Sequence, residues 1–451
     1  MVAVAAEPQS ATALHNAAFR PMREPGRWFW PLFAALAALV ALAAVAYGYQ
    51  LLAGLWVAGY NDRAFYGIYE ANLVAFIGVS YGGALVSAVL RLLNLPWRAP
   101  ITRMAEAMAL ISLLVGASFA IIHLGRPERI WQLIVFPQAA SPIVWDAIAI
   151  STYLAATLIF LYLPLIPDLA IARDRLGHSS SRPRRAFYRI AAVGWRGTPA
   201  QRRSLNWSVG AIAILIIPLA ISVHSVLAWA FSMTSRAGWH STIFGPYFVI
   251  GALYSGVALV IVIVALFRKA YRLEPYIGLR HFVSLARIMA ALGVVYLYFT
   301  FAEMLTSGYV RTRDEASIVA ALLEGSFAPA FWGFIVGGIL IPLVLSLLPA
   351  ARQVRWLVLA SVLVVTGMWL KRLLITLPSA TAPLIGDVWG TALLTWVPIL
   401  ISVGATAAIP LGLMITFRFV PILALDEMAQ VDAQDAVGPA FEPPASAEVV
   451  R

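Results

Sequence analysis

Two ionisable residues stand at the ends of the short polar segment that joins two long apolar stretches: His123 closes the first stretch and Asp146 opens the second. A neutral imidazole accepts a proton near neutral pH, and a nearby carboxylate orients it and stabilises the imidazolium. A hydroquinone needs such acceptors because its ring hydroxyls lose protons as its electrons leave. The pair therefore predicts quinol oxidation or quinone reduction. The alternative is a structural salt bridge.

Two further residues could belong to the same site. Arg126 lies just outside the predicted membrane boundary, where it could hold Asp146 ionised, attract an acidic partner, or act as an interfacial anchor. Glu70 has a similar predicted depth near the start of another apolar stretch. We include both as candidate quinol-binding residues, with an interfacial role for Glu70 as the alternative.

Four other polar residues interrupt apolar stretches and could carry protons: Glu106, His224, Glu303 and Lys371. Charged groups at membrane depth persist mainly when they are paired, face a cavity or are functional. Each also has a structural interpretation. His224 could bond a neighbouring carbonyl or hydroxyl group, and Lys371 could either snorkel or pair with Glu303.

The chain has no cysteine. This excludes thiolate-held iron–sulfur clusters and CxxCH haem attachment. Only two of the histidines, His123 and His224, fall in predicted spans, which is too few for a two-haem cytochrome b. We therefore expect this chain to bind no metal, haem or iron–sulfur cluster, so that any such centre belongs to a partner.

Composition identifies the solvent of this chain. Of 451 residues, 61% are hydrophobic and 12% are charged, which indicates an integral membrane protein. Apolar stretches of about 20 residues are long enough to cross a hydrocarbon core as α-helices. We predict an all-α protein with ten transmembrane helices at 30–58, 68–92, 103–124, 142–166, 206–232, 243–267, 283–306, 328–348, 354–376 and 391–417.

The distribution of arginine and lysine predicts the topology. Most of the 32 basic residues fall on one side if both termini are cytoplasmic. The net charge of +11 then reflects topology and anionic lipid rather than nucleic acid. The predicted divisions are a cytoplasmic segment 1–29, helices 1–4 in 30–166, a basic cytoplasmic linker 167–205, helices 5–10 in 206–417, and a partly disordered cytoplasmic tail 418–451.

Several segments together resemble the polysulfide reductase/NrfD family of membrane subunits, and more narrowly the quinol-binding membrane subunit of alternative complex III. The resemblance rests on "HLGRPERIW", "WD", "SVHSVLAW", "AGWHSTIFGPYFVIGALYSG", "YLYFTFAEMLT" and "MWLKRLLIT". It implies two four-helix bundles flanked by the first and last helices. It also implies a quinol pocket near the periplasmic face, formed around His123 and Asp146, and a proton route that includes His224 and Glu303.

The resemblance also implies an assembly in the bacterial inner membrane. The expected ligand is a quinol such as menaquinol, and the expected partners are a periplasmic iron–sulfur or molybdopterin-like subunit, cytochrome c subunits, a homologous ten-helix subunit and lipids. The chain would be a subunit of an oxidoreductase that is not active alone. Two departures weaken a complete proton path: Ala230 stands where relatives often have an acidic residue, and Lys371-Arg372 where they often have Glu-Arg.

Two other functions remain open from the sequence. The chain could be the homologous anchor or proton-conducting subunit that binds no quinol. It could instead be a secondary transporter, which would show broken helices near the membrane midplane.

Overall fold

The structure is a computed structural model that describes residues 9–437 except 63, 65, 66, 177–180, 235, 240, 311 and 384–387. Among these residues it contains helices and no strand, only an isolated bridge between Asn61 and Ala64. The all-α prediction is confirmed.

Ten segments are long and apolar enough to span a membrane, as the hydropathy predicted. They are α2 (Phe29–Ala53), α3 (Ile68–Leu92), α4 (Ala99–Ile122) with the preceding turn, α6 (Pro142–Leu176), α8 (Pro199–Ser232), α9 (Phe244–Tyr271), α10 (Leu279–Val310), the consecutive α12, η4 and α13 (Ala328–Gly333, Phe334–Leu340, Ile341–Leu347), α14 (Val354–Thr381) and α15 (Trp396–Phe419).

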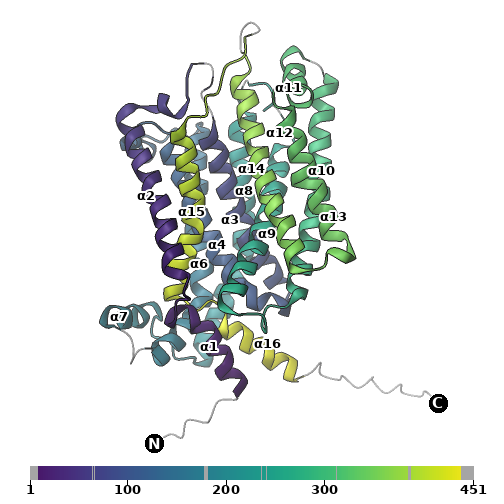
Figure 1. The fold of residues 1–451 in the computed structure, drawn as a ribbon. Coiled ribbons are helices and arrows are strands. Elements are labelled where there is room, and N and C mark those ends of the chain that lie inside the picture. Colours follow the sequence, from purple (N-terminus) through teal and green to yellow (C-terminus); the bar gives the residue numbers. More distant parts are fainter. Residues whose placement is uncertain are drawn as a thin grey trace, which may run out of the picture.

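The spanning helices form two groups that share a central contact (Figure 1). In the first group α3 packs on α4 and α8, and α6 packs on α8 and α4. In the second group α9 packs on α10 and α14, while α13 contacts both of these helices. The groups meet mainly where α3 crosses α9, and α2 pairs with α15 along one side.

Glycines allow the central contact between α3 and α9. A Cβ atom added to Gly82 would clash with the backbone of Gly256, and one added to Gly256 would clash with Gly82. Membrane helices approach closely at small residues because packing and hydrogen bonding, rather than hydrophobic burial, hold them together. Helix α3 is accordingly buried over almost its whole length.

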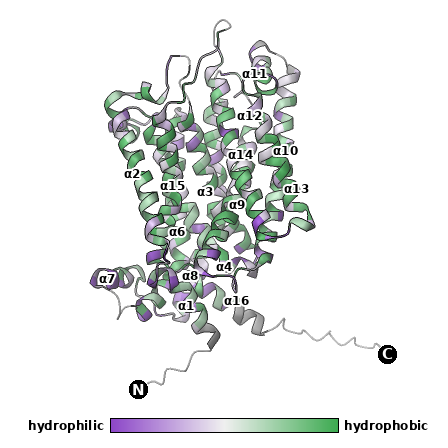
Figure 2. Ribbon diagram, viewed as in Figure 1, coloured by the Kyte–Doolittle hydropathy of each residue, from purple (hydrophilic) through white to green (hydrophobic). Residues whose placement is uncertain are grey.

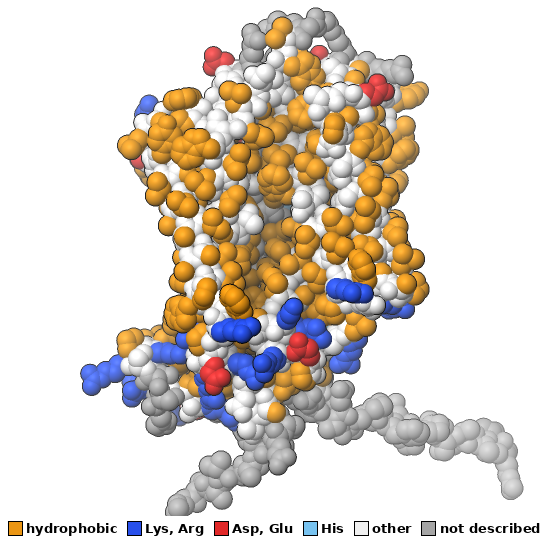
Figure 3. Space-filling model, viewed as in Figure 1, with side chains coloured by type: hydrophobic (Ala, Val, Ile, Leu, Met, Phe, Trp, Pro, Cys, Tyr) orange, Lys and Arg blue, Asp and Glu red, His pale blue; other side chains and the backbone are white. Residues whose placement is uncertain are grey.

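The two ends of the molecule differ in charge. The short helices α1 (Gln9–Arg23), α7 (Arg182–Ala191) and α16 (Leu425–Val437) lie at one end. Lys and Arg side chains gather there, below a hydrophobic belt (Figures 2 and 3). We call this the basic end and the other the opposite end.

Several helices run beyond their predicted limits. Helix α6 continues to Leu176 and α8 begins at Pro199, so both occupy parts of the predicted 167–205 linker. Pro164 and Pro167 lie inside α6 without ending it. Part of the predicted tail forms α16, whereas 438–451 lie outside the described residues.

Ion pairs fix α16 to the basic end of the first group. Glu427 accepts hydrogen bonds from Arg91 and Arg98. Burial alone would raise the pKa of the Glu427 carboxyl, but the nearby guanidinium groups outweigh that effect and hold its pKa below the usual value. Asp168, itself paired to Arg103 at 2.7 Å, accepts from the backbone N–H of Asp426 at 3.0 Å. Helix α16 thereby connects α3, α4 and α6.

Candidate functional site

The predicted turn after His123 forms at the opposite end. Helix α4 ends at Ile122, and Gly125 adopts φ +69°, the left-handed conformation expected of a residue that ends a helix. Pro127 then begins a short 3₁₀ helix, η3 (Pro127–Arg129), which is followed by α5 (Gln132–Val135). The chain thus runs across the end of the bundle before α6 re-enters it.

The His123 ring is oriented by its own helix. Its Nδ1 lies 2.9 Å from the carbonyl oxygen of Phe119. In the neutral ring this contact places the proton on Nδ1, because a carbonyl oxygen only accepts. The other nitrogen, Nε2, is then the proton acceptor.

His123, Glu70 and Asp146 line one pocket of about 520 Å³. They come from three helices of the first group, α3, α4 and α6, while α8 supplies a further wall. The other lining residues are mainly apolar and include Ala230. The position where relatives often carry an acid is thus a methyl group in the pocket wall.

The structure does not form the direct His123–Asp146 contact that the sequence suggested. No hydrogen bond or ion pair joins these two described residues, although both line the pocket. The Oδ1 atom of Asp146 is buried and has no hydrogen-bond partner among the described residues. Such an atom is costly to bury unless something else in the pocket satisfies it.

Glu70 is held more firmly than Asp146. Its carboxylate accepts from the hydroxyl of Tyr60 at 2.9 Å and from the backbone N–H of Gly67 at 2.8 Å. His123 is also close enough for its charge to act on this carboxylate. The histidine is therefore linked electrostatically to Glu70, a residue that the sequence placed at the edge of the site.

The sequence analysis missed the residues that support this wall. The hydroxyl of Tyr69 donates to Oε1 of Gln50 at 2.5 Å, and Nε2 of Gln50 donates to the carbonyl oxygen of Ile122 at 3.1 Å. These bonds fix the residue that precedes His123. A glutamine within an apolar stretch, as at Gln50, was the available signal.

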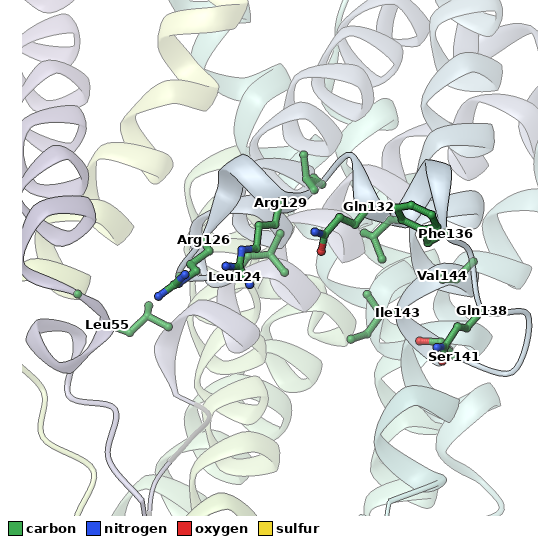
Figure 4. A pocket seen from close by; sticks show the side chains of 14 residues that line it. Leu55, Leu124, Arg126, Arg129, Gln132, Phe136, Gln138, Ser141, Ile143 and Val144 are labelled. Atoms are coloured by element: carbon green, nitrogen blue, oxygen red, sulfur yellow. The ribbon is translucent and has the colours of Figure 1, made fainter.

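Arg126 lies in a neighbouring groove rather than beside Asp146. The groove, about 930 Å³, also contains Arg129, Gln132 and Gln138 (Figure 4). It adjoins the pocket because Leu124, Ile130, Leu133, Ser141 and Ile143 line both. In the sequence, the depth of Arg126 was readable but its direction was not.

The candidate proton-route residues lie in three places. Glu106 is near the basic end, where its carboxylate accepts from the hydroxyl of Ser87 at 2.8 Å and lies 3.6 Å from Arg91. His224 is buried within the first group, with its ring 4.9 Å from that of Tyr81. Glu303 and Lys371 belong to the second group.

Lys371 pairs with Glu303 at 2.9 Å, one of the two arrangements expected from the sequence. Both side chains are buried, and the ammonium nitrogen of Lys371 also lies 5.3 Å from the ring centre of Tyr247. A cation over an aromatic face gains further stabilisation. This pair neutralises its own charges inside the membrane.

Among the described residues, no group of three or more histidine, cysteine, aspartate or glutamate side chains could hold a metal ion. The pocket therefore offers proton acceptors and apolar walls.

Comparisons with known proteins identify relatives along most of the chain. The dimethyl sulfoxide reductase membrane protein inferred in Halobacterium salinarum is 28% identical over 409 residues, which cover 86% of this chain and 90% of the relative. A component of the selenate reductase of Mesobacillus selenatarsenatis is 24% identical, covering 78% of this chain and 82% of the relative. The Hdr-like menaquinol oxidoreductase integral membrane subunit of Archaeoglobus fulgidus is 26% identical, covering 79% and 80%. The model of the family "Polysulphide reductase, NrfD" matches residues 56–383. Because this match spans well over half of the chain, the protein belongs to the polysulphide reductase NrfD family.

Proposed function

We propose that this chain is the membrane subunit of a quinol-linked oxidoreductase and that it oxidises quinol in the pocket of Glu70, His123 and Asp146. The observation that carries the proposal is the meeting of an oriented histidine and an unpartnered buried carboxylate oxygen in one largely apolar cavity. Apolar walls suit an aromatic ring, and the two acceptors suit its hydroxyl groups.

The separation of His123 and Asp146 has a chemical use in this proposal. A quinol carries hydroxyl groups at opposite positions of its ring, so one can donate to Nε2 of His123 while the other donates to the Asp146 carboxylate. Each group then takes one proton as the quinol loses two electrons to a redox centre of a partner. Glu70, within electrostatic reach of His123, favours the imidazolium form.

The proposed sidedness follows the positive-inside rule. With the basic end in the cytoplasm, both termini are cytoplasmic and the pocket lies near the periplasmic face of a bacterial inner membrane. Protons from quinol then leave to the periplasm. The groove with Arg126 and Arg129 adjoins the pocket and is proposed to receive an acidic surface of an iron–sulfur or molybdopterin-like subunit.

The relatives support two kinds of assembly. In the first, as in alternative complex III, electrons pass from menaquinol to iron–sulfur and cytochrome c subunits beside a homologous ten-helix subunit. In the second, they pass to a reductase subunit, as the names of the dimethyl sulfoxide and selenate reductase relatives suggest. The menaquinol oxidoreductase relative supports menaquinol as the donor in either case.

Two functions compete with quinol oxidation. A non-quinol-binding anchor would leave the unpartnered Asp146 oxygen without a role, and a secondary transporter would transport its substrate without a redox partner. A proton route through Glu106, His224, Glu303 and Lys371 stays a prediction, since these residues lie in three separate places.

Binding of a fluorescent quinol-site inhibitor of the hydroxyquinoline N-oxide class to the purified complex tests the proposal. The wild-type complex should quench its fluorescence, and His123→Ala should weaken binding by about tenfold or more because a hydrogen bond to the acceptor nitrogen is lost. His281→Ala is the matched control: it removes another largely buried histidine, at the basic end of α10. Equal binding by wild type and His123→Ala would contradict the proposed pocket.

A further inference from the structure

A second cavity opens on the side of the molecule, away from the His123 pocket. It holds about 380 Å³ between α3, α9, α14 and α15. The face shown in Figure 3 is hollowed between the hydrophobic side chains of α14 and α15. We call this cavity the Arg372 crevice, after the one charged side chain among its described lining residues.

Arg372 has too few partners for a buried cation. Its Nη1 donates to the carbonyl oxygen of Met368 at 2.8 Å, and its Nη2 makes a long contact of 3.4 Å with the hydroxyl of Ser255. A guanidinium has five N–H donors. No carboxylate pairs with it among the described residues, in contrast to the neighbouring Lys371.

The depth of Arg372 limits what could satisfy it. It lies about 27 Å along α14 from the basic end and about 14 Å from the other end of that helix, at 1.5 Å per residue. A phospholipid keeps its phosphate near the membrane surface, because a charge at this depth costs several kcal/mol. The group that reaches Arg372 should therefore be a neutral hydrogen-bond acceptor on a lipid-soluble molecule.

The walls of the crevice favour a flat head and a long apolar chain. Trp369 lies beside Arg372, and its indole N–H donates to Asn72 at 2.8 Å, which fixes the orientation of the ring. From there Leu259, Ile263 and Leu266 of α9 line the crevice toward the basic end. These leucine and isoleucine side chains extend for about 16 Å below Ser255. Carbonyl oxygens at Arg372 and an isoprenoid chain along α9 would fill this shape.

We propose that the Arg372 crevice binds a second isoprenoid quinone, with a ring carbonyl accepting hydrogen bonds from the Arg372 guanidinium. The proposal takes its class of ligand from the proposed function but assigns it to a different site. It concerns binding and includes no electron transfer at this site.

Photolabelling of membranes that contain the complex, with an isoprenoid azidoquinone, tests the proposal. In wild type we expect crosslinks in residues 259–266 or 365–372, in addition to those around His123. Arg372→Leu should reduce crevice labelling by about tenfold or more, since it removes the charged donor. His123→Ala should leave crevice labelling intact, so failure of the pocket and failure of the crevice are distinguishable.

A second pair of variants avoids changing the charge. Thr406 lines the crevice and is only partly buried, so Thr406→Trp should fill the space and reduce crevice labelling with Arg372 intact. Val403→Trp adds the same bulk to an exposed position on α15 outside the lining and should label as wild type does. Wild-type membranes without crevice crosslinks would overturn the proposal. Crevice labelling by a photoreactive phosphatidylglycerol that the azidoquinone does not compete away would overturn it equally.

Discussion

Two carboxylates within the membrane have opposite surroundings. Glu303 is buried against Lys371 at 2.9 Å, with aromatic rings around the ammonium group. Asp146 faces a pocket of about 520 Å³, and its Oδ1 has no partner among the described residues. Both residues interrupt apolar stretches of sequence, so composition and predicted depth do not separate them.

The difference separates a structural role from a binding role. A buried ion pair leaves its partners little freedom to exchange protons with a ligand, and removing one partner leaves an uncompensated charge. A carboxylate beside a cavity keeps an oxygen available. Intramembrane charge is therefore a better guide to function when it is read together with the space and the partners around it.

The largest contrast should appear in turnover. Asp146→Asn should lower quinol-dependent reduction of the electron acceptor by roughly 10²-fold or more, because a proton acceptor is lost. Glu303→Gln should stay within a few-fold of wild type. Steady-state assays of the intact complex measure both. A similar loss in both variants would break the comparison and favour a proton route through Glu303.

Stability should show the reverse contrast. Glu303→Gln should destabilise the protein by about 3–5 kcal/mol because Lys371 is left buried without its counter-charge. Asp146→Asn should change stability little, since no partner loses an interaction. Reversible unfolding in mixed micelles gives the free energies. The double variant Glu303→Gln/Lys371→Met should recover much of the loss, and failure to do so would argue against the ion pair as its cause.

A third carboxylate, outside the membrane, sharpens the comparison through pH. The pKa of Glu427 is lowered in the folded protein, so its contribution is fully present above the unfolded pKa of about 4.3 and disappears as the pH falls through the folded pKa. We expect Glu427→Gln to loosen α16 by about 1–3 kcal/mol at neutral pH. Hydrogen exchange of 425–431 measures this effect.

The control for that measurement is Glu274→Gln, which changes an exposed carboxylate at the same end. It should leave the exchange of 425–431 as in wild type at every pH. If Glu427→Gln behaved like this control, the arginine contacts of Glu427 would not hold α16 in place.

Hydropathy predicted the ten helices because a span needs only length and apolar composition. The turn at Gly125 was predictable for a local reason, since glycine tolerates the left-handed conformation there. Helix rotation was not predictable, because a helix that is apolar all round has no readable face. Arg126 was therefore assigned to the quinol pocket, although its side chain lies in the adjoining groove.

Long-range partners were the other missing information. Asn72 meets Trp369, and Gln50 meets both Tyr69 and the end of α4, through contacts between segments far apart in the sequence. Nothing near these residues in the chain indicates such partners. The docking of α16 was missed for the same reason: an acidic segment in an apparently polar tail finds its arginines on α3 and beside α4.

The position of α16 has a consequence for biosynthesis. Helices α3, α4 and α6 enter the membrane long before α16 is synthesised, yet Glu427 and the backbone of Asp426 complete the ion-pair network at their basic end. Until then, Arg91 and Arg98 lack this counter-charge. The earliest helices of the chain thus reach their final electrostatic state only when one of its latest has been made.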